Sequence, residues 1–364
     1  MSDQQFMQLA LEQAARGEGR TAPNPPVGAL IVKNGEIVGR GYHAAAGQPH
    51  AEVNAIRDAA GAASGSTLYV TLEPCNHTGR TGPCTEAVIA AGISRVVVGC
   101  VDPNPSVAGS GVERLQQAGI DVQTGLLEKE CNRLIAPFAK HISTGLPFVT
   151  LKMAMTLDGQ TATSNGDSQW ISNEQSRRYV HEMRDRSDAV MVGAGTVLTD
   201  DPLLTTRLPQ GGRDATRVVI DSQLRMSVES KLLSGESTAP VIVFATEQAE
   251  PDKRKRLAAT GADVVITGAD AQGRVDLNSV LTELGKRDIQ SVLLEGGATL
   301  AGESVRTGIV DRVAIFVAPL LFGGNDGSFL FNGAGSRLLA DATRLSDIRT
   351  RMFGDDILIE GEVA

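Results

Sequence analysis

Three side chains in the first quarter of the sequence have residue types and a spacing that suit a metal ion. His50 stands two residues before Glu52, and Cys75 and Cys84 follow in a second segment. One imidazole and two thiolates give a tetrahedral zinc ion three protein ligands and leave the fourth position to water. That arrangement is typical of a catalytic zinc rather than of a closed structural one. The pattern therefore predicts chemistry at the metal.

Glu52 has the position of a proton carrier for that chemistry. Zinc lowers the pKa of a bound water from about 15.7 to about 7. A carboxylate beside the water can take its proton and pass it to a departing nitrogen. Glu52 falls in the first turn of an expected helix over residues 51–60, near this water but outside the coordination sphere. A His-x-Glu motif followed by Pro-Cys and a second Cys is the signature of zinc-dependent base deaminases.

The spacing of the two cysteines departs from that signature, because eight residues separate Cys75 from Cys84. The insert, Pro-Cys-Asn-His-Thr-Gly-Arg-Thr-Gly-Pro-Cys over residues 74–84, resembles the deaminase domain of the bifunctional riboflavin-biosynthesis deaminase-reductase family. The alternative is a structural zinc site or a pair of ordinary buried cysteines. His77 as a fourth ligand would exclude water, so we expect it to support the site or the substrate instead.

Length and charge bound the remaining possibilities. A chain of 364 residues suits two domains, and the resemblance implies a zinc-dependent pyrimidine deaminase over 1–145 and an NADPH-dependent reductase over 146–364. The net charge of -9 and the lack of a Lys/Arg block argue against a nucleic-acid partner. Residues 1–20 lack the basic start and apolar middle of a signal peptide, and no later run is long enough to span a membrane. We expect a cytoplasmic protein without membrane contact.

The order of expected elements indicates an α/β fold in both halves. Two strands, 27–32 and 36–41, flank the Asn34-Gly35 hairpin turn. Helix and strand then alternate, which predicts a three-layer α/β/α sandwich, and by resemblance a cytidine-deaminase-like one. The further expected elements of this half are helices 51–60, 84–91, 111–118 and 127–145 and strands 66–72, 95–101 and 120–125.

The second half again alternates strand and helix. Residues 328–356 are expected to be irregular before a final strand that pairs antiparallel with its neighbour. The expected strands are 148–155, 189–192, 217–221, 241–246, 264–267, 291–295, 312–318 and 357–360, and helices are expected over 173–186 and 277–286.

Glycines follow two of these strands. No Gly-x-Gly-x-x-Gly motif occurs, but residues 193–196 read Gly-Ala-Gly-Thr and residues 295–297 read Glu-Gly-Gly. Glycines at such turns let backbone amides approach phosphate groups, and a helix beginning at Ala298 would add its dipole. The alternative is that they are glycines of ordinary tight turns.

Segments 152–159, 168–171, 193–196, 200–207 and 219–222 are similar, in this order, to the reductase half of the same family. That half resembles dihydrofolate reductase in fold and uses NADPH, and the resemblance thus covers nearly the whole chain. It assigns to the cofactor Ala154, Trp170, Thr196, Asp200, Ser222, Gly297, Ala298, Thr299, Leu300, Ala301, Gly302 and Glu303. It assigns to the substrate Ser168, Arg184, Leu204, Arg207 and Glu295 in the second half and Asn24, His43, Arg80 and Asn104 in the first.

Several of these residues also have plainer interpretations. Arg184 and Arg207 suit a ribose phosphate through forked hydrogen bonds, but Arg184 lies in a charged run that is typical of an exposed helix face. Asn24 and Asn104 stand beside prolines and could be ordinary turn residues. Trp170 could cap a core instead of facing a cofactor ring.

The origin of any preference for NADPH stays open at this point. Asp221, at the end of its strand, would ordinarily repel a 2′-phosphate. Ser222 and Arg225, which follow it, could accept one. The sequence alone does not decide between them.

The resemblance implies two reactions. Zinc hydroxide would deaminate 2,5-diamino-6-ribosylamino-4(3H)-pyrimidinone 5′-phosphate with Glu52 moving protons. NADPH would then reduce the ribosyl group to ribityl, giving 5-amino-6-ribitylaminouracil 5′-phosphate, with Asp200 or Glu295 assisting. The alternatives are a zinc nucleoside or transfer-RNA deaminase with a non-catalytic nucleotide-binding second half, or a structural zinc protein. The expected partner is a small pyrimidine ribose phosphate, and a homo-oligomer remains open.

Overall fold

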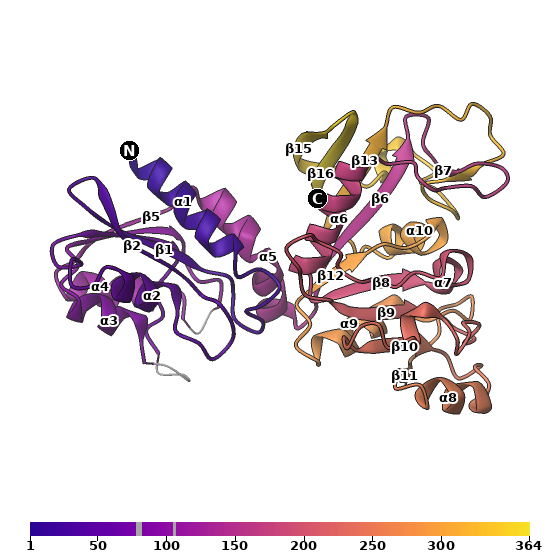
Figure 1. The fold of residues 1–364 in the computed structure, drawn as a ribbon, viewed down its shortest axis with the longest axis horizontal. Coiled ribbons are helices and arrows are strands. Elements are labelled where there is room, and N and C mark those ends of the chain that lie inside the picture. Colours follow the sequence, from indigo (N-terminus) through magenta and orange to yellow (C-terminus); the bar gives the residue numbers. More distant parts are fainter. Residues whose placement is uncertain (78–81, 105–106) are drawn as a thin grey trace. The chain divides into compact units, whose positions relative to one another are not determined.

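The computed structural model describes residues 1–77, 82–104 and 107–364. Its contacts divide the chain into two compact units, Met1–Leu146 and Pro147–Ala364, each with its own sheet (Figure 1). Within the described residues, no helix has the length and apolar character needed to cross a bilayer.

Unit 1 is built on a five-stranded sheet in the order β2-β1-β3-β4-β5. Strand β1 pairs antiparallel with both neighbours, and β3, β4 and β5 run parallel. The expected hairpin is confirmed, since Asn34 and Gly35 both have positive φ, 52° and 81°, as a two-residue turn of this type needs. The strands are β1 Gly28–Lys33, β2 Glu36–Tyr42, β3 Thr67–Leu72, β4 Arg95–Cys100 and β5 Asp121–Thr124.

Helices cover both faces of this sheet. Successive side chains of a strand point to opposite faces, so apolar residues of one strand can pack against helices on both sides. Ile31 and Val96 pack with residues of α2, α3 and α4, whereas Leu30 and Val97 pack with residues of α1 and α5. The expected three-layer α/β/α sandwich is thereby confirmed. The helices are α1 Asp3–Ala15, α2 Ala51–Asp58, α3 Cys84–Ala90, α4 Ser110–Gln117 and α5 Glu128–Thr144.

Two glycines of β2 let helix α2 lie directly on the sheet. A Cβ at Gly41 would stand 2.2 Å from the carbonyl oxygen of Ala51, and one at Gly39 would stand 2.3 Å from that of Ala55. No side chain fits in that space. The close approach fixes the start of α2, where His50 is the N-cap residue.

Unit 2 is built on a nine-stranded sheet in the order β11-β10-β9-β8-β12-β6-β13-β16-β15. Neighbours from β11 to β13 run parallel, and β16 and β15 are added antiparallel. The strands of this sheet are β6 Phe148–Thr156, β8 Ala189–Gly193, β9 Thr216–Ile220, β10 Val241–Ala245, β11 Asp263–Ile266, β12 Ser291–Leu294, β13 Arg312–Ala318, β15 Leu345–Phe353 and β16 Asp356–Val363.

The order of the strands brings three distant turns together. Strands β9, β8 and β12 are neighbours and parallel, so the turns after them lie at one edge of the sheet (Figure 1). Such an edge, at the carboxyl ends of parallel strands, is where α/β sheets bind ligands. The helices of unit 2 are α6 Glu174–Arg186, α7 Ala194–Asp200, α8 Pro251–Ala258, α9 Leu277–Gly285 and α10 Ala298–Arg306, and a small sheet pairs β7 Gln160–Ala162 with β14 Ser328–Phe329.

The α/β class expected for both halves is confirmed, but the irregular chain expected before the last strand is partly wrong. Residues Leu345–Phe353 form β15 and pair with β16. This strand is mostly exposed and its register shifts between Ser346 and Arg349. An exposed edge strand with an irregularity shows no regular apolar alternation, so the sequence pattern missed it.

Candidate active sites

The three expected metal ligands converge in unit 1. The Nδ1 atom of His50 lies 3.2 Å from the Sγ atom of Cys84 and 3.5 Å from the Sγ atom of Cys75, and the three ligand atoms lie within 4.8 Å of one another. Tetrahedral zinc with ordinary Zn–N and Zn–S bonds places such atoms about 3.5 Å apart. The donor types and their separations therefore fit zinc.

Local structure explains why the ligands meet. His50 precedes α2, Cys84 is the first residue of α3, and Cys75 follows β3. The backbone N–H of Cys84 donates to the Cys75 sulfur at 3.4 Å, and the N–H of Thr85 donates to the Cys75 carbonyl at 3.2 Å. Hydrogen bonds from the Cys84 thiol, from His50 and from the Cys84 N–H lower the pKa of the Cys75 thiol to about 4. A thiolate is the form that binds a metal.

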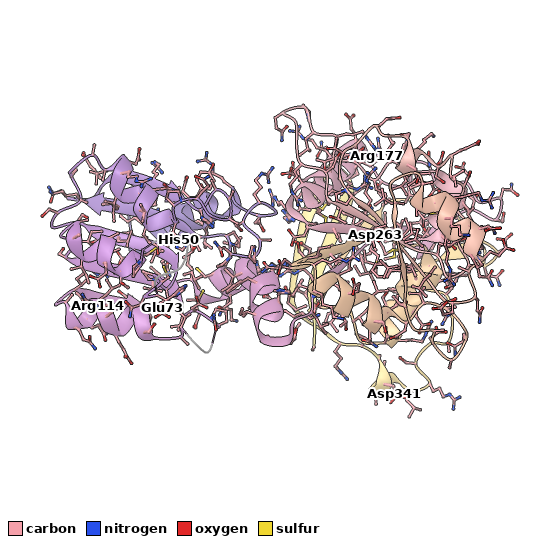
Figure 2. The ribbon with its side chains drawn as sticks, turned by 90° about the horizontal axis from the view of Figure 1, so that it is seen from below. His50, Glu73, Arg114, Arg177, Asp263 and Asp341 are labelled. Carbon is pink, nitrogen blue, oxygen red and sulfur yellow. The ribbon has the colours of Figure 1, made fainter. Side chains whose placement is uncertain are left out.

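Glu73 anchors the turn that carries Cys75. Its buried carboxylate accepts the backbone N–H groups of Gly111 at 2.8 Å, Gly109 at 3.0 Å and Val112 at 3.1 Å. The carboxylate thus caps the start of α4, where orphan amides need acceptors. Figure 2 shows His50 and Glu73 within the body of unit 1.

Glu52 is buried beside the metal ligands, with 3% of its surface exposed. Burial, followed by the negative charge of Cys75, raises the pKa of Glu52 to about 7. Its Oε2 atom is buried and has no hydrogen-bond partner among the described residues. A buried carboxylate oxygen without a partner is costly, so this atom is placed to meet a water molecule or a ligand. The expected position of Glu52 is therefore consistent with proton transfer.

The other residues expected at this site are Asn24, His43, Arg80 and Asn104. The ring of His43 stands 5.0 Å from the ring of His50. Its Nε2 atom accepts from the Asn24 amide at 3.1 Å, and its Nδ1–H donates to Pro49 at 3.3 Å. Burial lowers the pKa of His43, which favours this neutral form. Asn104 follows β4, and its N–H donates to Asp102 at 2.8 Å. Arg80 lies outside the described residues.

His77 is exposed and does not belong to the metal group found among the described residues. The expectation that it is not a fourth ligand is consistent with this position. Cys100 and Cys131 are buried in the core of unit 1 and are not members of that group.

In unit 2, a cavity of about 700 Å³ gathers most residues expected at the reductase site. At its base, the Nε and Nη2 atoms of Arg184 bind the two carboxylate oxygens of Glu295 at 2.6 and 3.0 Å. Burial alone would raise the pKa of Glu295, but Arg184 and Lys152 outweigh it and hold that pKa below its usual value. The expected residues that line this cavity are Ala154, Ser168, Trp170, Arg184, Thr196, Asp200, Leu204, Arg207 and Glu295.

Arg184 is thus not an exposed helix charge, as its charged neighbours suggested, because only 12% of its side chain is exposed. Its forked donors are occupied by Glu295, and Nη1 donates to the Thr205 carbonyl at 3.1 Å. Arg207 has a less occupied guanidinium, whose Nη1 donates to the Thr205 hydroxyl at 3.2 Å. Of the two arginines, Arg207 is the one with donors to offer a phosphate.

Lys152 and His181 also line this cavity, although the sequence pattern did not single them out. Lys152 lies on β6 two residues before Ala154, so both face the cavity; its Nζ stands 3.9 Å from Glu295, and burial lowers its pKa. His181 lies one helical turn before Arg184 on α6, and its Nδ1 accepts the N–H of Arg207 at 3.3 Å. Burial and the two arginines lower the pKa of His181 to about 4.

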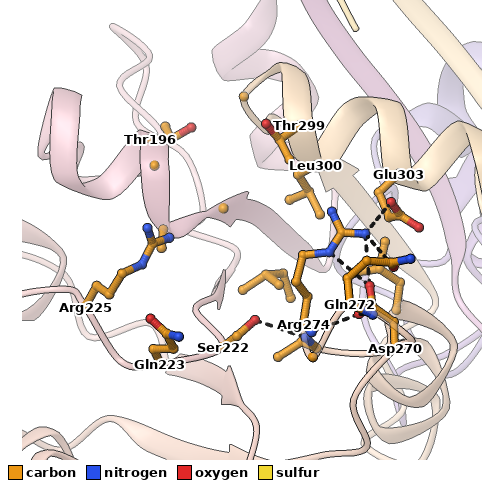
Figure 3. A pocket seen from close by; sticks show the side chains of 18 of the residues that line it. Thr196, Ser222, Gln223, Arg225, Asp270, Gln272, Arg274, Thr299, Leu300 and Glu303 are labelled. Carbon is orange, nitrogen blue, oxygen red and sulfur yellow. Dashed lines mark hydrogen bonds and ion pairs between the residues drawn. The ribbon is translucent and has the colours of Figure 1, made fainter. Parts of the chain in front are cut away.

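A second cavity, of about 440 Å³, lies at the edge formed by β9, β8 and β12 (Figure 3). It is lined by both glycine-containing turns. Helix α10 has no side-chain cap, and a Cβ at Gly195 would meet no atom within 4 Å. Packing against neighbouring atoms therefore does not require a glycine at position 195. The absence of a side chain leaves open space at this point of the cavity. The expected cofactor residues that line this cavity are Thr196, Ser222, Gly297, Ala298, Thr299, Leu300 and Glu303.

Two residues of the expected cofactor segment do not line it. Ala301 is fully buried, and a Cβ at Gly302 would stand 2.2 Å from the Asn332 carbonyl oxygen. They occupy the face of α10 that packs against the protein. The Glu303 carboxylate, although at the cavity, is bound by Arg274 at 2.7 Å and Arg306 at 2.6 Å.

The site of unit 1 and the cavities of unit 2 define a zinc-binding deaminase domain joined to an α/β reductase domain. Comparison with known sequences agrees. Residues 147–359 match the RibD C-terminal domain, and residues 1–100 match the cytidine and deoxycytidylate deaminase zinc-binding region. The chain belongs to the RibD family, the bifunctional deaminase-reductases of riboflavin biosynthesis.

Individual relatives resemble the chain over its whole length. The riboflavin biosynthesis protein RibD of Escherichia coli (strain K12) is 43% identical over 373 residues, which cover 99% of both chains. RibD of Bacillus amyloliquefaciens is 42% identical over 98% of this chain and 95% of its own. The solved structure of Acinetobacter baumannii RibD, form 1, superposes with a TM-score of 0.86 at 39% identity, covering 100% of this chain and 99% of that one. This coverage of both halves favours the bifunctional interpretation over a nucleoside or transfer-RNA deaminase.

Proposed function

We propose that the chain carries out two successive reactions on one pyrimidine ribose phosphate. Unit 1 deaminates 2,5-diamino-6-ribosylamino-4(3H)-pyrimidinone 5′-phosphate, and unit 2 reduces the ribosyl group with NADPH to give 5-amino-6-ribitylaminouracil 5′-phosphate. A Thermotoga maritima protein of known structure, 40% identical with a TM-score of 0.86 over 99% of this chain and 98% of its own, is described as a diaminohydroxyphosphoribosylaminopyrimidine deaminase and 5-amino-6-(5-phosphoribosylamino)uracil reductase.

The observation that carries the deaminase half is the unpartnered Oε2 atom of Glu52 beside His50, Cys75 and Cys84. Zinc held by these three residues would lower the pKa of water into the neutral range. Glu52 accepts a proton from the attacking water and returns one to the exocyclic amine, so that the ring carbon exchanges nitrogen for oxygen and ammonia leaves. A carboxyl group with a pKa of about 7 can do both near neutral pH.

The pyrimidine would be held by polar groups around this centre. In the Asn24–His43 hydrogen bond the side-chain N–H of Asn24 donates to the imidazole, which is held in its neutral form. The side-chain carbonyl oxygen of Asn24 is not used in this bond, so it can accept a hydrogen bond from a base edge. Asn104 and Arg80 complete the expected set, with Arg80 suited by charge to the ribose phosphate.

In unit 2 NADPH would supply the hydride for the anomeric carbon of the opened imine. The two cavities share Thr196, so a cofactor with its phosphates at the glycine turns can extend from one to the other. Arg207 binds the substrate phosphate, with its backbone held by His181.

A proton must reach the imine nitrogen as hydride reaches carbon. Glu295 is ionised and paired with Arg184, so it is a poor donor. Lys152 lines the same cavity with a lowered pKa, and its ammonium is suited to give the proton. Asp200, whose pKa is raised by burial, is the second candidate.

The proposal is tested by mass spectrometry of the product formed from the diaminopyrimidinone ribosylamine phosphate, with and without NADPH. Exchange of an amine for oxygen without NADPH, and a gain of two further hydrogens only with it, is the expected result. No change in either sample from folded, zinc-loaded protein would contradict the assignment.

A further inference from the structure

We propose that Arg225, together with the hydroxyl of Ser222, binds the 2′-phosphate of NADPH and thereby makes unit 2 select NADPH over NADH. The inference rests on the proposed reductase function and adds to it the residues that discriminate between the two dinucleotides.

The first argument is the place of Arg225 at the smaller cavity. Arg225, Gln223 and Ser222 come from the turn after β9 and line one side of it (Figure 3). The glycine turns after β8 and β12 line the same cavity. With the pyrophosphate at those turns, the adenine-side ribose falls towards the next strand, β9. In dinucleotide-binding α/β sheets the residues at that strand end contact the ribose 2′ position.

The second argument removes the objection raised by Asp221. An acidic side chain at this strand end would accept from a ribose 2′-hydroxyl and repel a 2′-phosphate. Asp221 is fully buried, and its Oδ2 atom accepts the backbone N–H of Met226 at 2.8 Å. It does not line the cavity. The carboxylate therefore shapes the turn and is not presented to a cofactor.

The third argument is the state of the charges that line the cavity, which are Arg225, Arg274, Asp270 and Glu303. Arg274 is bound by Glu303 at 2.7 Å and by Asp270 at 3.0 Å (Figure 3), so two carboxylates offset its charge. Arg225 makes an ion pair of 3.6 Å with the buried Asp221, and 55% of its side chain is exposed. Its planar donors are thus available for a phosphate, which guanidinium groups bind in forked fashion.

Ser222 adds a neutral donor beside this charge. Its Oγ atom accepts the N–H of Val275 at 3.0 Å. The hydroxyl hydrogen is then free to point to a second acceptor. Arg225 and this hydroxyl, two residues apart in one turn, both line the cavity and supply it with a charged and a neutral donor.

The test compares the full-length protein with Arg225→Gln and Arg225→Lys. Arg178→Gln is the control, since Arg178 is a 59% exposed arginine of α6 that does not line either cavity. Dissociation constants are measured by calorimetry for NADPH, NADH and adenosine 2′,5′-bisphosphate, and thermal unfolding checks the fold. Binding is read directly, so the result does not depend on turnover.

We expect Arg225→Gln to weaken NADPH and the bisphosphate about 10- to 100-fold, which is about 1.4–2.7 kcal/mol, and to leave NADH within about twofold. Arg225→Lys, which keeps the charge but loses the fork, should fall between, and Arg178→Gln should match the wild type. If the ratio of the NADPH and NADH dissociation constants is unchanged in Arg225→Gln, or if both dinucleotides bind equally more weakly, the inference about Arg225 is overturned. The proposed reductase function is not affected by that result. Wild-type protein that binds neither dinucleotide overturns the proposed cofactor as well.

Discussion

Arg184 and Glu295 form a two-pronged ion pair, with Nε–Oε1 and Nη2–Oε2 distances of 2.6 and 3.0 Å, at the base of the larger cavity of unit 2. The residues are 111 positions apart, on α6 and just after β12. Both side chains are nearly buried. The pair therefore fixes the helix to the sheet edge while presenting a neutralised surface to the cavity.

Removing one member of this pair should destabilise unit 2. Arg184→Met leaves the Glu295 carboxylate buried without its partner, which typically costs about 3–5 kcal/mol. The double variant Arg184→Met/Glu295→Gln should recover most of that loss, because no charge is stranded. Urea unfolding followed by circular dichroism measures both. An equal free energy of unfolding for the single variant and the wild type would show that the ion pair does not stabilise unit 2.

His181 should make the stability of unit 2 depend on pH. Its pKa in the folded protein is lowered to about 4 from an ordinary value of 6.5. The unfolded chain therefore takes up a proton first as pH falls, and stability contributed by the neutral imidazole is lost between about pH 6.5 and 4. Because the ring is only half-buried, we expect less than the ~3 kcal/mol of the full shift.

The measurement for His181 is the free energy of unfolding at a series of pH values for the wild type and His181→Gln. Glutamine can still accept the Arg207 N–H but does not titrate. The difference between the two proteins should shrink or change sign as pH falls through this window. A difference that is constant from pH 7 to pH 4 would contradict the assignment.

Lys152 should matter for reduction and not for deamination. Lys152→Met keeps the length of the side chain and removes the proton donor, so we expect reduction to fall by a factor on the order of 10²–10⁴. Ammonia release by unit 1 should remain at the wild-type rate. Asp200→Asn is the matched comparison, and a larger loss of reduction in that variant would move the donor role to Asp200.

The parts of this account that could be predicted from sequence are the local ones. His50, Cys75 and Cys84 stand at helix starts and a strand end within 35 positions, so spacing and residue type were enough to find them. The alternation of strands and helices gave the three layers of unit 1 in the same way.

What escaped prediction depends on contacts between distant segments. Arg184 looked like a surface charge because its partner, Glu295, comes from a distant segment that follows β12. His181 is recognisable as a site residue only once α6 packs against the 204–207 segment. Asp221 read as an obstacle to a 2′-phosphate because its burial by the following turn is invisible in the sequence. Ala301 and Gly302 belong to the expected cofactor segment, yet helical rotation turns them away from the cavity.

The metal site makes a separate prediction about composition. His50→Ala removes one of three protein ligands, so purified protein should lose its zinc together with ammonia release. Elemental analysis of the wild type should give about one zinc per chain. His77→Ala is the control for zinc content alone, because that side chain is exposed and outside the ligand group. Retention of stoichiometric zinc by His50→Ala would contradict the assignment of the ligands.

The most direct test of the central claim is ammonia release by Glu52→Gln. Glutamine preserves the shape of the side chain and the zinc ligands but cannot accept a proton. The account predicts that this variant keeps its zinc, binds substrate, releases no measurable ammonia, and still reduces the deaminated compound when it is supplied with NADPH. Full deamination by zinc-loaded Glu52→Gln would contradict the account, because the proton transfer assigned to Glu52 would then have another source.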